Sequence, residues 1–103
     1  MTTLRLTLSE KPFEVMVTGE KVIEYRRQSQ WIRSRLFDKK GEPRVYDKIE
    51  FVNGYGKDRP RFTVTYNGFS LVNSVNETFS NGLCVVIDEP VYAIRCSPMI
   101  EPH

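Results

Sequence analysis

The chain has little of the chemistry that metal sites and histidine-dependent enzymes require. Its only histidine is His103, the last of 103 residues, and its two cysteines, Cys84 and Cys96, are far apart and outside any Cys-x-x-Cys motif. A structural zinc site needs about four closely placed nitrogen or sulfur ligands. We therefore expect no metal, no cofactor and no catalytic histidine, and we expect both cysteines to be ordinary reduced residues.

Long apolar runs are also missing. The longest apolar stretches, such as Val91 to Ile94, are far shorter than the roughly 20 residues that a membrane-spanning helix needs. The first residues, Met-Thr-Thr-Leu-Arg, lack the basic, apolar and small-residue order of a secretory signal. We expect no membrane partner and a cytoplasmic location.

The length and composition fit one folded unit. Two separate cores could not both be buried in a chain this short, and a hydrophobic content of 40% is enough for one core. We predict a single domain over residues 1–103, with flexible ends at 1–3 and 97–103.

Positive charge is concentrated in the middle of the chain, although the net charge is only +2. The stretch from Lys21 to Arg61 holds twelve basic and six acidic residues. A basic surface on one side of a protein attracts nucleic acids and other anions. The alternative is that these charges are scattered over a solvated surface.

Hydrophobic periodicity and capping residues predict a mixed order of elements. Ser9 and Gly19 are typical of the start and the end of a short helix, and Ser29 is a typical N-cap of a second helix. The predicted order for the first half of the chain is a strand at 4–8, a helix at 9–19, a strand at 21–27, a helix at 29–37 and a strand at 44–52.

The second half predicts strands and turns. Asn67-Gly68 is a preferred type I′ turn, so we predict a hairpin of 61–66 and 69–75 in which Tyr66 faces Phe69. A polar stretch at 73–82 is followed by two closing strands at 83–87 and 91–96. The whole predicts an α+β fold, a small and mostly antiparallel β-barrel of about six strands with two short helices.

One short motif carries a family resemblance. Gly19, Lys21, Glu24 and Arg26 form a G-x-K-x-x-E-x-R run after the first predicted helix, and Asp47 lies at a later predicted strand. In this order the residues resemble the ASCH domain family, over roughly residues 4–95. The resemblance implies a PUA-like β-barrel whose cleft, lined by the signature residues, holds RNA or a nucleotide-like ligand.

The signature residues have suitable chemistry for such a ligand. Lys21 can contact a phosphate or carbonyl oxygen, and Arg26 can make planar bidentate bonds. Glu24 can accept hydrogen bonds from a base or act as a general base. Strand alternation places Glu24 and Arg26 on one face and Lys21 on the other, so the three converge only if the strand begins irregularly. The alternative is a surface Glu-Arg pair beside a solvated lysine.

The second predicted helix holds another candidate group. An exposed Trp31 can stack on an unpaired base while Arg33 and Arg35 hold phosphates, which is a common way of gripping a single strand. The alternative is that Trp31 belongs to the core.

A third candidate group lies in and beside the glycine-rich loop at 53–60. It combines Tyr55 with Arg59 and Arg61, and the glycines of the loop would let the backbone approach a ligand. The alternative is that these glycines only serve the turn.

Three classes of function fit these residues. The first is an RNA- or nucleotide-binding module. The second is a small hydrolase acting on RNA or a modified nucleoside, with Lys21 and Glu24 as catalytic residues and Glu77 as a further candidate base. In the amidohydrolase branch of the ASCH family a threonine stands at the position of Glu24, so here a carboxylate would have to activate water. The third is a protein-interaction module that uses Trp31 and the Tyr55 loop.

Overall fold

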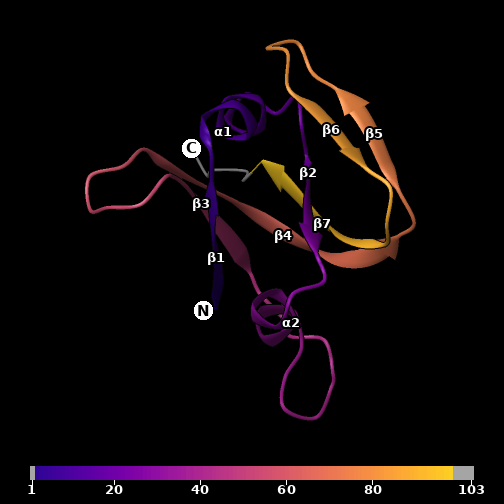
Figure 1. The fold of residues 1–103 in the computed structure, drawn as a ribbon. Coiled ribbons are helices and arrows are strands. Elements are labelled where there is room, and N and C mark those ends of the chain that lie inside the picture. The colour runs from indigo at the N-terminus through magenta and orange to yellow at the C-terminus, as the bar shows by residue number, and fades with distance from the viewer. Residues whose placement is uncertain (1, 99–103) are drawn as a thin grey trace.

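The computed structural model describes residues 2–98, which contain two helices and seven strands (Figure 1). In chain order these elements are β1 (Thr3–Leu8), α1 (Glu10–Val17), β2 (Ile23–Arg27), α2 (Gln30–Leu36), β3 (Lys48–Asn53), β4 (Arg61–Val72), β5 (Val75–Thr78), β6 (Cys84–Ile87) and β7 (Val91–Pro98). Neither helix has the length and apolar character needed to cross a membrane within residues 2–98.

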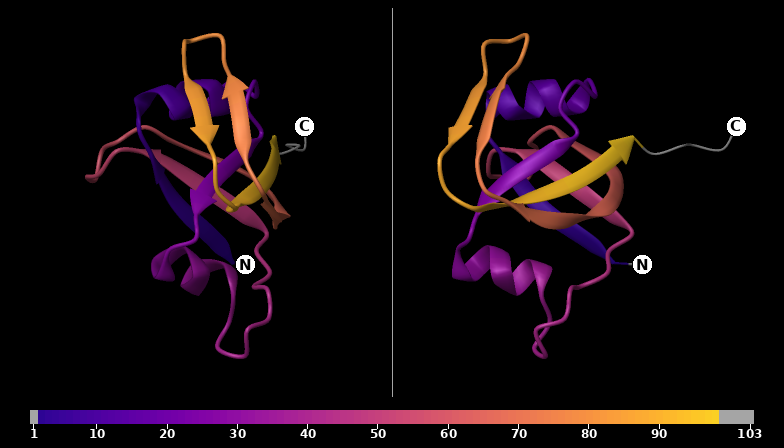
Figure 2. Two further views of the ribbon diagram at one scale, coloured as in Figure 1. Left: turned by 45° about the vertical axis from the view of Figure 1, so that its right-hand side comes forward. Right: turned by 90° about the vertical axis from the view of Figure 1, so that its right-hand side faces the viewer.

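Five strands form one curled sheet in the order β1-β3-β4-β7-β2. β1 and β3 are parallel and the other neighbours are antiparallel, while β5 and β6 form a separate hairpin. The curl makes a half-barrel whose two edge strands are β1 and β2 (Figures 1 and 2). The predicted α+β class, the two helices and the mostly antiparallel sheet are confirmed, but the barrel is open between its edge strands.

The core lies on the inner face of this sheet. Leu4, Leu6 and Leu8 alternate along β1 and are buried there, because successive side chains of a strand point to opposite faces. α1 covers one end of the half-barrel and α2 the other (Figure 1). Ile32 and Leu36 anchor α2 to the core, since residues four apart share one face of a helix.

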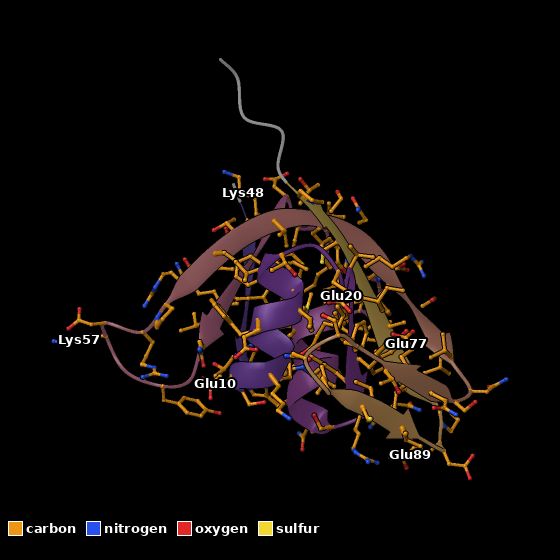
Figure 3. The ribbon with its side chains drawn as sticks, turned by 90° about the horizontal axis from the view of Figure 1, so that it is seen from above. Glu10, Glu20, Lys48, Lys57, Glu77 and Glu89 are labelled. Atoms are coloured by element: carbon orange, nitrogen blue, oxygen red, sulfur yellow. The ribbon has the colours of Figure 1, made fainter. Side chains whose placement is uncertain are left out.

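The predicted hairpin at Asn67-Gly68 is wrong. β4 continues through these residues without a turn, and both of its halves pair with β7. Tyr66 lies opposite Cys96, and Phe69 lies opposite Ile94. Gly68 has a φ of +87°, and the irregular register inserts one extra residue into β4. Because of this bulge, Tyr66 and Phe69 both point inward despite their odd spacing. The bulge also bends β4, which curves around α1 in the view of Figure 3.

Other boundaries also differ from the prediction. β3 begins at Lys48 instead of residue 44, and Val45 is 83% exposed before it. The polar stretch at 73–82 contains β5, which pairs with β6, so the predicted strand at 83–87 does not join the main sheet. Thr3 belongs to β1, and Ser97 and Pro98 belong to β7, so these parts of the predicted flexible ends are ordered strand. Residues 1 and 99–103 lie outside the described residues.

Candidate functional site

The end of α1 determines where the Lys21 side chain points. Gly19 follows the helix with a φ of +85°, and its N–H donates to the Met16 carbonyl at 3.1 Å. The backbone N–H of Lys21 donates to the Val15 carbonyl at 2.9 Å, so Lys21 is tied to α1 and β2 begins only at Ile23. Strand alternation therefore does not apply at Lys21. The strand begins irregularly, which was the condition for Lys21 to reach Glu24 and Arg26.

Lys21, Glu24 and Arg26 form one ion-pair cluster. Lys21 Nζ lies 3.3 Å from Glu24 Oε1, and Arg26 Nη2 lies 2.8 Å from Glu24 Oε2. Arg26 Nε donates to the same Oε2 atom at 2.9 Å. Lys21 is 4% exposed and Glu24 is 7% exposed. The cluster is buried, so the alternative of a surface pair beside a solvated lysine is wrong.

Arg26 also connects the two edges of the half-barrel. Its Nη2 donates to the backbone carbonyl of Thr7 at 2.7 Å. Thr7 lies in β1 and Arg26 in β2, and no ladder pairing joins these two strands. A guanidinium therefore satisfies a carbonyl at the open edge of the sheet, where a barrel would have a backbone hydrogen bond.

A cleft of about 410 Å³ opens beside this connection. Its walls come from the end of β1, the start of α1, β2, the start of α2 and the end of β6. They include Thr7, Ser9, Pro12, Glu24, Arg26, Arg27, Ser29, Trp31 and Ile87.

Lys21 does not line this cleft. It lines a second hollow of about 360 Å³ on the other side of the cluster, together with Met16, Val22 and Cys96. The Lys21 ammonium also donates to the Ile23 carbonyl and lies 3.8 Å from the Met16 sulfur. The ammonium donors are used inside the protein. Lys21 therefore forms an ion pair with Glu24 from the side away from the cleft, and it does not face the cleft with Glu24 and Arg26.

The start of α2 brings Trp31 to the cleft. Ser29 Oγ accepts the Ile32 N–H at 3.1 Å, as predicted for an N-cap. Trp31 is 47% exposed, so the alternative of a core tryptophan is wrong. The Arg35 guanidinium lies 4.9 Å from the Trp31 ring centroid, in a cation–π contact. Arg33 and Arg35 do not line the cleft but lie further along the same helix.

The Tyr55 group lies apart from the cleft. Tyr55 and Arg61 line a different hollow, on the outer face of β1 and β3. Arg61 pairs with Glu50 at 3.5 Å, and Arg59 donates to the Asn53 carbonyl at 2.6 Å. Both arginines hold the loop and the strand, and the structure does not bring this group to the signature cluster.

Glu77, the further candidate base, does not line the cleft. It accepts a hydrogen bond from the Tyr25 hydroxyl at 2.6 Å, and Tyr25 alternates with Glu24 and Arg26 along β2. Burial, and then the hydrogen bond to Glu77, raise the pKa of Tyr25 to about 12. The role of Glu77 is therefore to hold the β5–β6 hairpin against β2.

Two further contacts fasten the same hairpin. Glu20 accepts the N–H and the hydroxyl of Ser80 at 2.8 and 2.5 Å, which lowers the pKa of Glu20. Arg27 pairs with Glu89 in the turn after β6. Sequence reasoning missed Arg27, although it stands next to Arg26. Arg27 lines the cleft together with Ile87, which ends β6.

The Cys96 thiol, which lines the second hollow, is not a reactive nucleophile. Burial raises the pKa of the Cys96 thiol to about 11, and its sulfur donates to the Val22 carbonyl at 3.2 Å. The thiolate is the reactive form of cysteine, so this neutral thiol is inert. Among residues 2–98, no three His, Cys, Asp or Glu side chains are grouped closely enough to hold a metal ion.

Asp47, the last position of the resemblance, has a structural contact. Its Oδ2 accepts the N–H of Thr2 at 3.3 Å, and its own N–H donates to the Thr2 carbonyl at 3.0 Å, so Asp47 ties the start of β1 to the approach of β3. Comparisons with family models, with curated proteins and with solved structures found no match to this chain. The ASCH resemblance therefore stays a prediction.

Proposed function

We propose that this protein is an RNA- or nucleotide-binding module of the ASCH, PUA-like type, acting in the cytoplasm, with its ligand in the cleft beside Arg26 and Trp31. The observation that carries the proposal is the charge balance of the buried cluster. One carboxylate, that of Glu24, lies between the two cations Lys21 and Arg26, which leaves an excess positive charge at the cleft wall. Such a site attracts an anion.

The Arg26 side chain is fixed by contacts that leave part of its guanidinium available to an anionic group. Its Nε and Nη2 atoms are engaged with Glu24 and Thr7, while Nη1 has no hydrogen bond or salt bridge to any residue in the described range 2–98. The guanidinium is therefore held in position at the cleft wall, with Nη1 left to donate to a ligand. A group already fixed in position loses less entropy on binding than a mobile one.

Trp31 supplies the second part of the binding surface. Arg35 contacts its ring, and Trp31 also lines the cleft. Stacking of a base on an aromatic side chain contributes about 1–3 kcal/mol. A positive group and a flat ring in the same cleft suit a ligand that joins a phosphate to a base.

The hydrolase alternative has weaker support. Both oxygens of Glu24 already accept charge-assisted hydrogen bonds, so activating water would compete with Lys21 and Arg26. Neither Cys96 nor Glu77 lies in the cleft. The arrangement favours a role for Glu24 in orienting Arg26. No specific observation favours the protein-interaction alternative at this cleft.

The fluorescence of Trp31, the only tryptophan of the chain, tests the proposal directly. We expect nucleoside 5′-monophosphates or short single-stranded RNA to quench it in a saturable way, because the ligand stacks beside the ring. Arg26→Lys should weaken binding, since a lysine cannot make the same planar contacts. Arg5→Gln is the matched control, because Arg5 is an exposed arginine in a different hollow. No saturable quenching by any of these ligands would overturn the proposal.

A further inference from the structure

A set of unpaired cations lies on α2 and on the loop that follows it. The only acidic residues between positions 28 and 46 are Asp38 and Glu42, and Asp38 Oδ1 accepts two loop N–H groups, from Lys40 and Glu42, at 2.8 and 3.0 Å. No salt bridge of residues 2–98 involves any basic residue of this stretch. We call these residues the α2 platform, and they are Arg33, Arg35, Lys39, Lys40 and Arg44.

The platform is braced and not merely a loose loop. Arg44 Nε donates to the carbonyls of Ser34 and Phe37, at 3.1 and 3.0 Å. The Tyr46 hydroxyl donates to the Arg35 carbonyl at 2.5 Å. These contacts satisfy carbonyls that the end of a helix otherwise leaves without partners. They also fix the Arg44 guanidinium, whose Nη atoms make no hydrogen bond within residues 2–98.

Arg44 separates two hollows. One, of about 350 Å³, is lined by Lys39 and Lys40 with Asp38. The other, of about 380 Å³, has Tyr46, Tyr66 and Phe69 in its wall, and Arg44 lines both. A basic hollow therefore adjoins an aromatic one, with an arginine between them.

The Tyr66 ring lines the aromatic hollow, and its hydroxyl lies buried behind the wall of the hollow. The Tyr66 hydroxyl is buried and has no hydrogen-bond partner within residues 2–98. Buried polar groups in native proteins nearly always have a partner, so an exception of this kind requires an explanation. A ligand that enters this hollow and displaces the Tyr66 ring enough to expose the hydroxyl would bring an acceptor oxygen or nitrogen to it.

α2 connects the platform to the cleft. Trp31 lines the cleft, Arg35 lies over the Trp31 ring, and the Arg35 carbonyl holds Tyr46 at the aromatic hollow. A helix of this length is only about 10 Å long, at 1.5 Å of rise per residue. The cleft and the platform are therefore neighbouring parts of one surface along α2.

We propose that the ligand is a single-stranded nucleic acid that leaves the cleft past Trp31 and continues along α2. The phosphates of this strand contact Arg35, Lys40 and Arg44. One base enters the aromatic hollow and accepts a hydrogen bond from the Tyr66 hydroxyl. This inference rests on the proposed function and extends the binding site from the cleft to a path along α2. A single strand fits because it repeats a phosphate and an unpaired base, as the surface repeats cations and aromatic rings.

The test compares a uridine oligonucleotide of about eight residues, within the usual site size of single-strand binders, with uridine 5′-monophosphate. Oligonucleotide affinity is measured by fluorescence anisotropy at several salt concentrations, and mononucleotide affinity by quenching of Trp31. We expect the oligonucleotide to bind much more tightly, because it reaches the platform. Lys40→Gln should lower the slope of log affinity against log salt by about 0.7, the value for one lost single-strand phosphate contact. It should leave mononucleotide binding unchanged.

Two other variants complete the test. Tyr66→Phe keeps the ring and removes the hydroxyl, so it should weaken the oligonucleotide several-fold and leave the mononucleotide unchanged. Lys57→Gln is the control, because Lys57 is a cation of the loop between β3 and β4 and lines neither the cleft nor the two platform hollows; Figure 3 shows it on the opposite side of the molecule from Glu77 and Glu89. It should change neither affinity.

The outcomes separate the two proposals. The strand path is overturned if the oligonucleotide and the mononucleotide bind with equal affinity, or if Lys40→Gln does not change the salt slope. Neither result contradicts the binding of a nucleotide in the cleft. An oligonucleotide that binds through Lys40 without quenching Trp31 overturns the cleft as its starting point. Displacement of the oligonucleotide by an acidic peptide of equal charge, at equal concentration, overturns the choice of nucleic acid.

Discussion

Glu24 is the only acidic residue in a buried group of three charges, so Glu24→Gln tests how the site is built. The glutamine amide keeps the shape of the side chain but removes the negative charge that Lys21 and Arg26 share. Lys21 is the more vulnerable of the two cations, because its side chain is almost completely buried. Its ammonium cannot be hydrated again unless the link between α1 and β2 opens.

The magnitude follows from the burial of each partner. Removing one member of a buried ion pair costs about 3–5 kcal/mol, because an uncompensated charge stays inside. Arg26 is less buried and keeps its hydrogen bond to the Thr7 carbonyl. It therefore contributes less to the loss of stability than Lys21 does. We expect a loss of about 3 kcal/mol in the free energy of unfolding. Small domains have about 5–15 kcal/mol in total, so the variant still folds.

Urea unfolding measures this loss. The fluorescence of Trp31 and the far-ultraviolet circular dichroism should report the same transition, with a midpoint at lower urea and an unchanged slope. A second variant separates lost charge from altered shape. Lys21→Met combined with Glu24→Gln should recover part of the stability, because no unpaired ammonium is left in the interior.

A surface carboxylate is the matched control. Glu50 pairs with Arg5 and Arg61 at 3.4 and 3.5 Å, and both arginines are exposed. Glu50→Gln should cost less than about 1 kcal/mol, as is usual for exposed pairs. If Glu24→Gln costs no more than this control, then the cluster is not a buried unit and the argument from its charge balance fails.

Three more predictions concern single side chains. Tyr66→Phe should raise the free energy of unfolding by about 1 kcal/mol, because it removes a buried hydroxyl without a partner; a clear loss in urea unfolding would show that the hydroxyl has a partner. The pKa of the Tyr25 hydroxyl is raised to about 12 in the folded protein, beside Glu77, so the folded state binds this proton more tightly than the unfolded chain does. The resulting contribution to the free energy of unfolding is complete below about pH 10. Stability should then fall as pH rises toward 12, and this part of the fall should be absent in Tyr25→Phe. A thiol reagent at pH 8 should modify the exposed Cys84 quickly and the buried Cys96 only after unfolding, since the pKa of Cys96 is raised to about 11; equal rates in mass spectrometry of the folded protein would contradict this.

Local sequence signals predicted the first half of the fold well. The alternation of β1, the glycine after α1 and the Ser29 cap of α2 each act within a few residues. Their effects are steric or come from short-range hydrogen bonds, so they are present in the chain before it folds. For the same reason the pairing of Glu24 with Arg26 on one face of β2 could be expected from their spacing alone.

The Asn67-Gly68 pair shows where local signals are ambiguous. A glycine with positive φ serves a tight hairpin and a β-bulge equally well. β7 is long enough to pair with both halves of β4, and the bulge keeps Tyr66 and Phe69 in the core. The competition between the two structures is decided by a strand more than twenty residues away along the chain, which no short window of sequence contains.

The residue types of the site, the charge of the Lys21–Arg26 stretch and the helix end at Gly19, before Lys21, can all be read from the sequence. How these residues are used depends on the tertiary structure. It placed the Thr7 carbonyl beside Arg26, turned Lys21 away from the cleft and moved Glu77 to the other side of β2. Each of these contacts joins segments that are distant in the chain or depends on which side chains are buried. Arg26 reaches Thr7 only when the sheet curls, because the curl brings the two edge strands within the reach of a side chain.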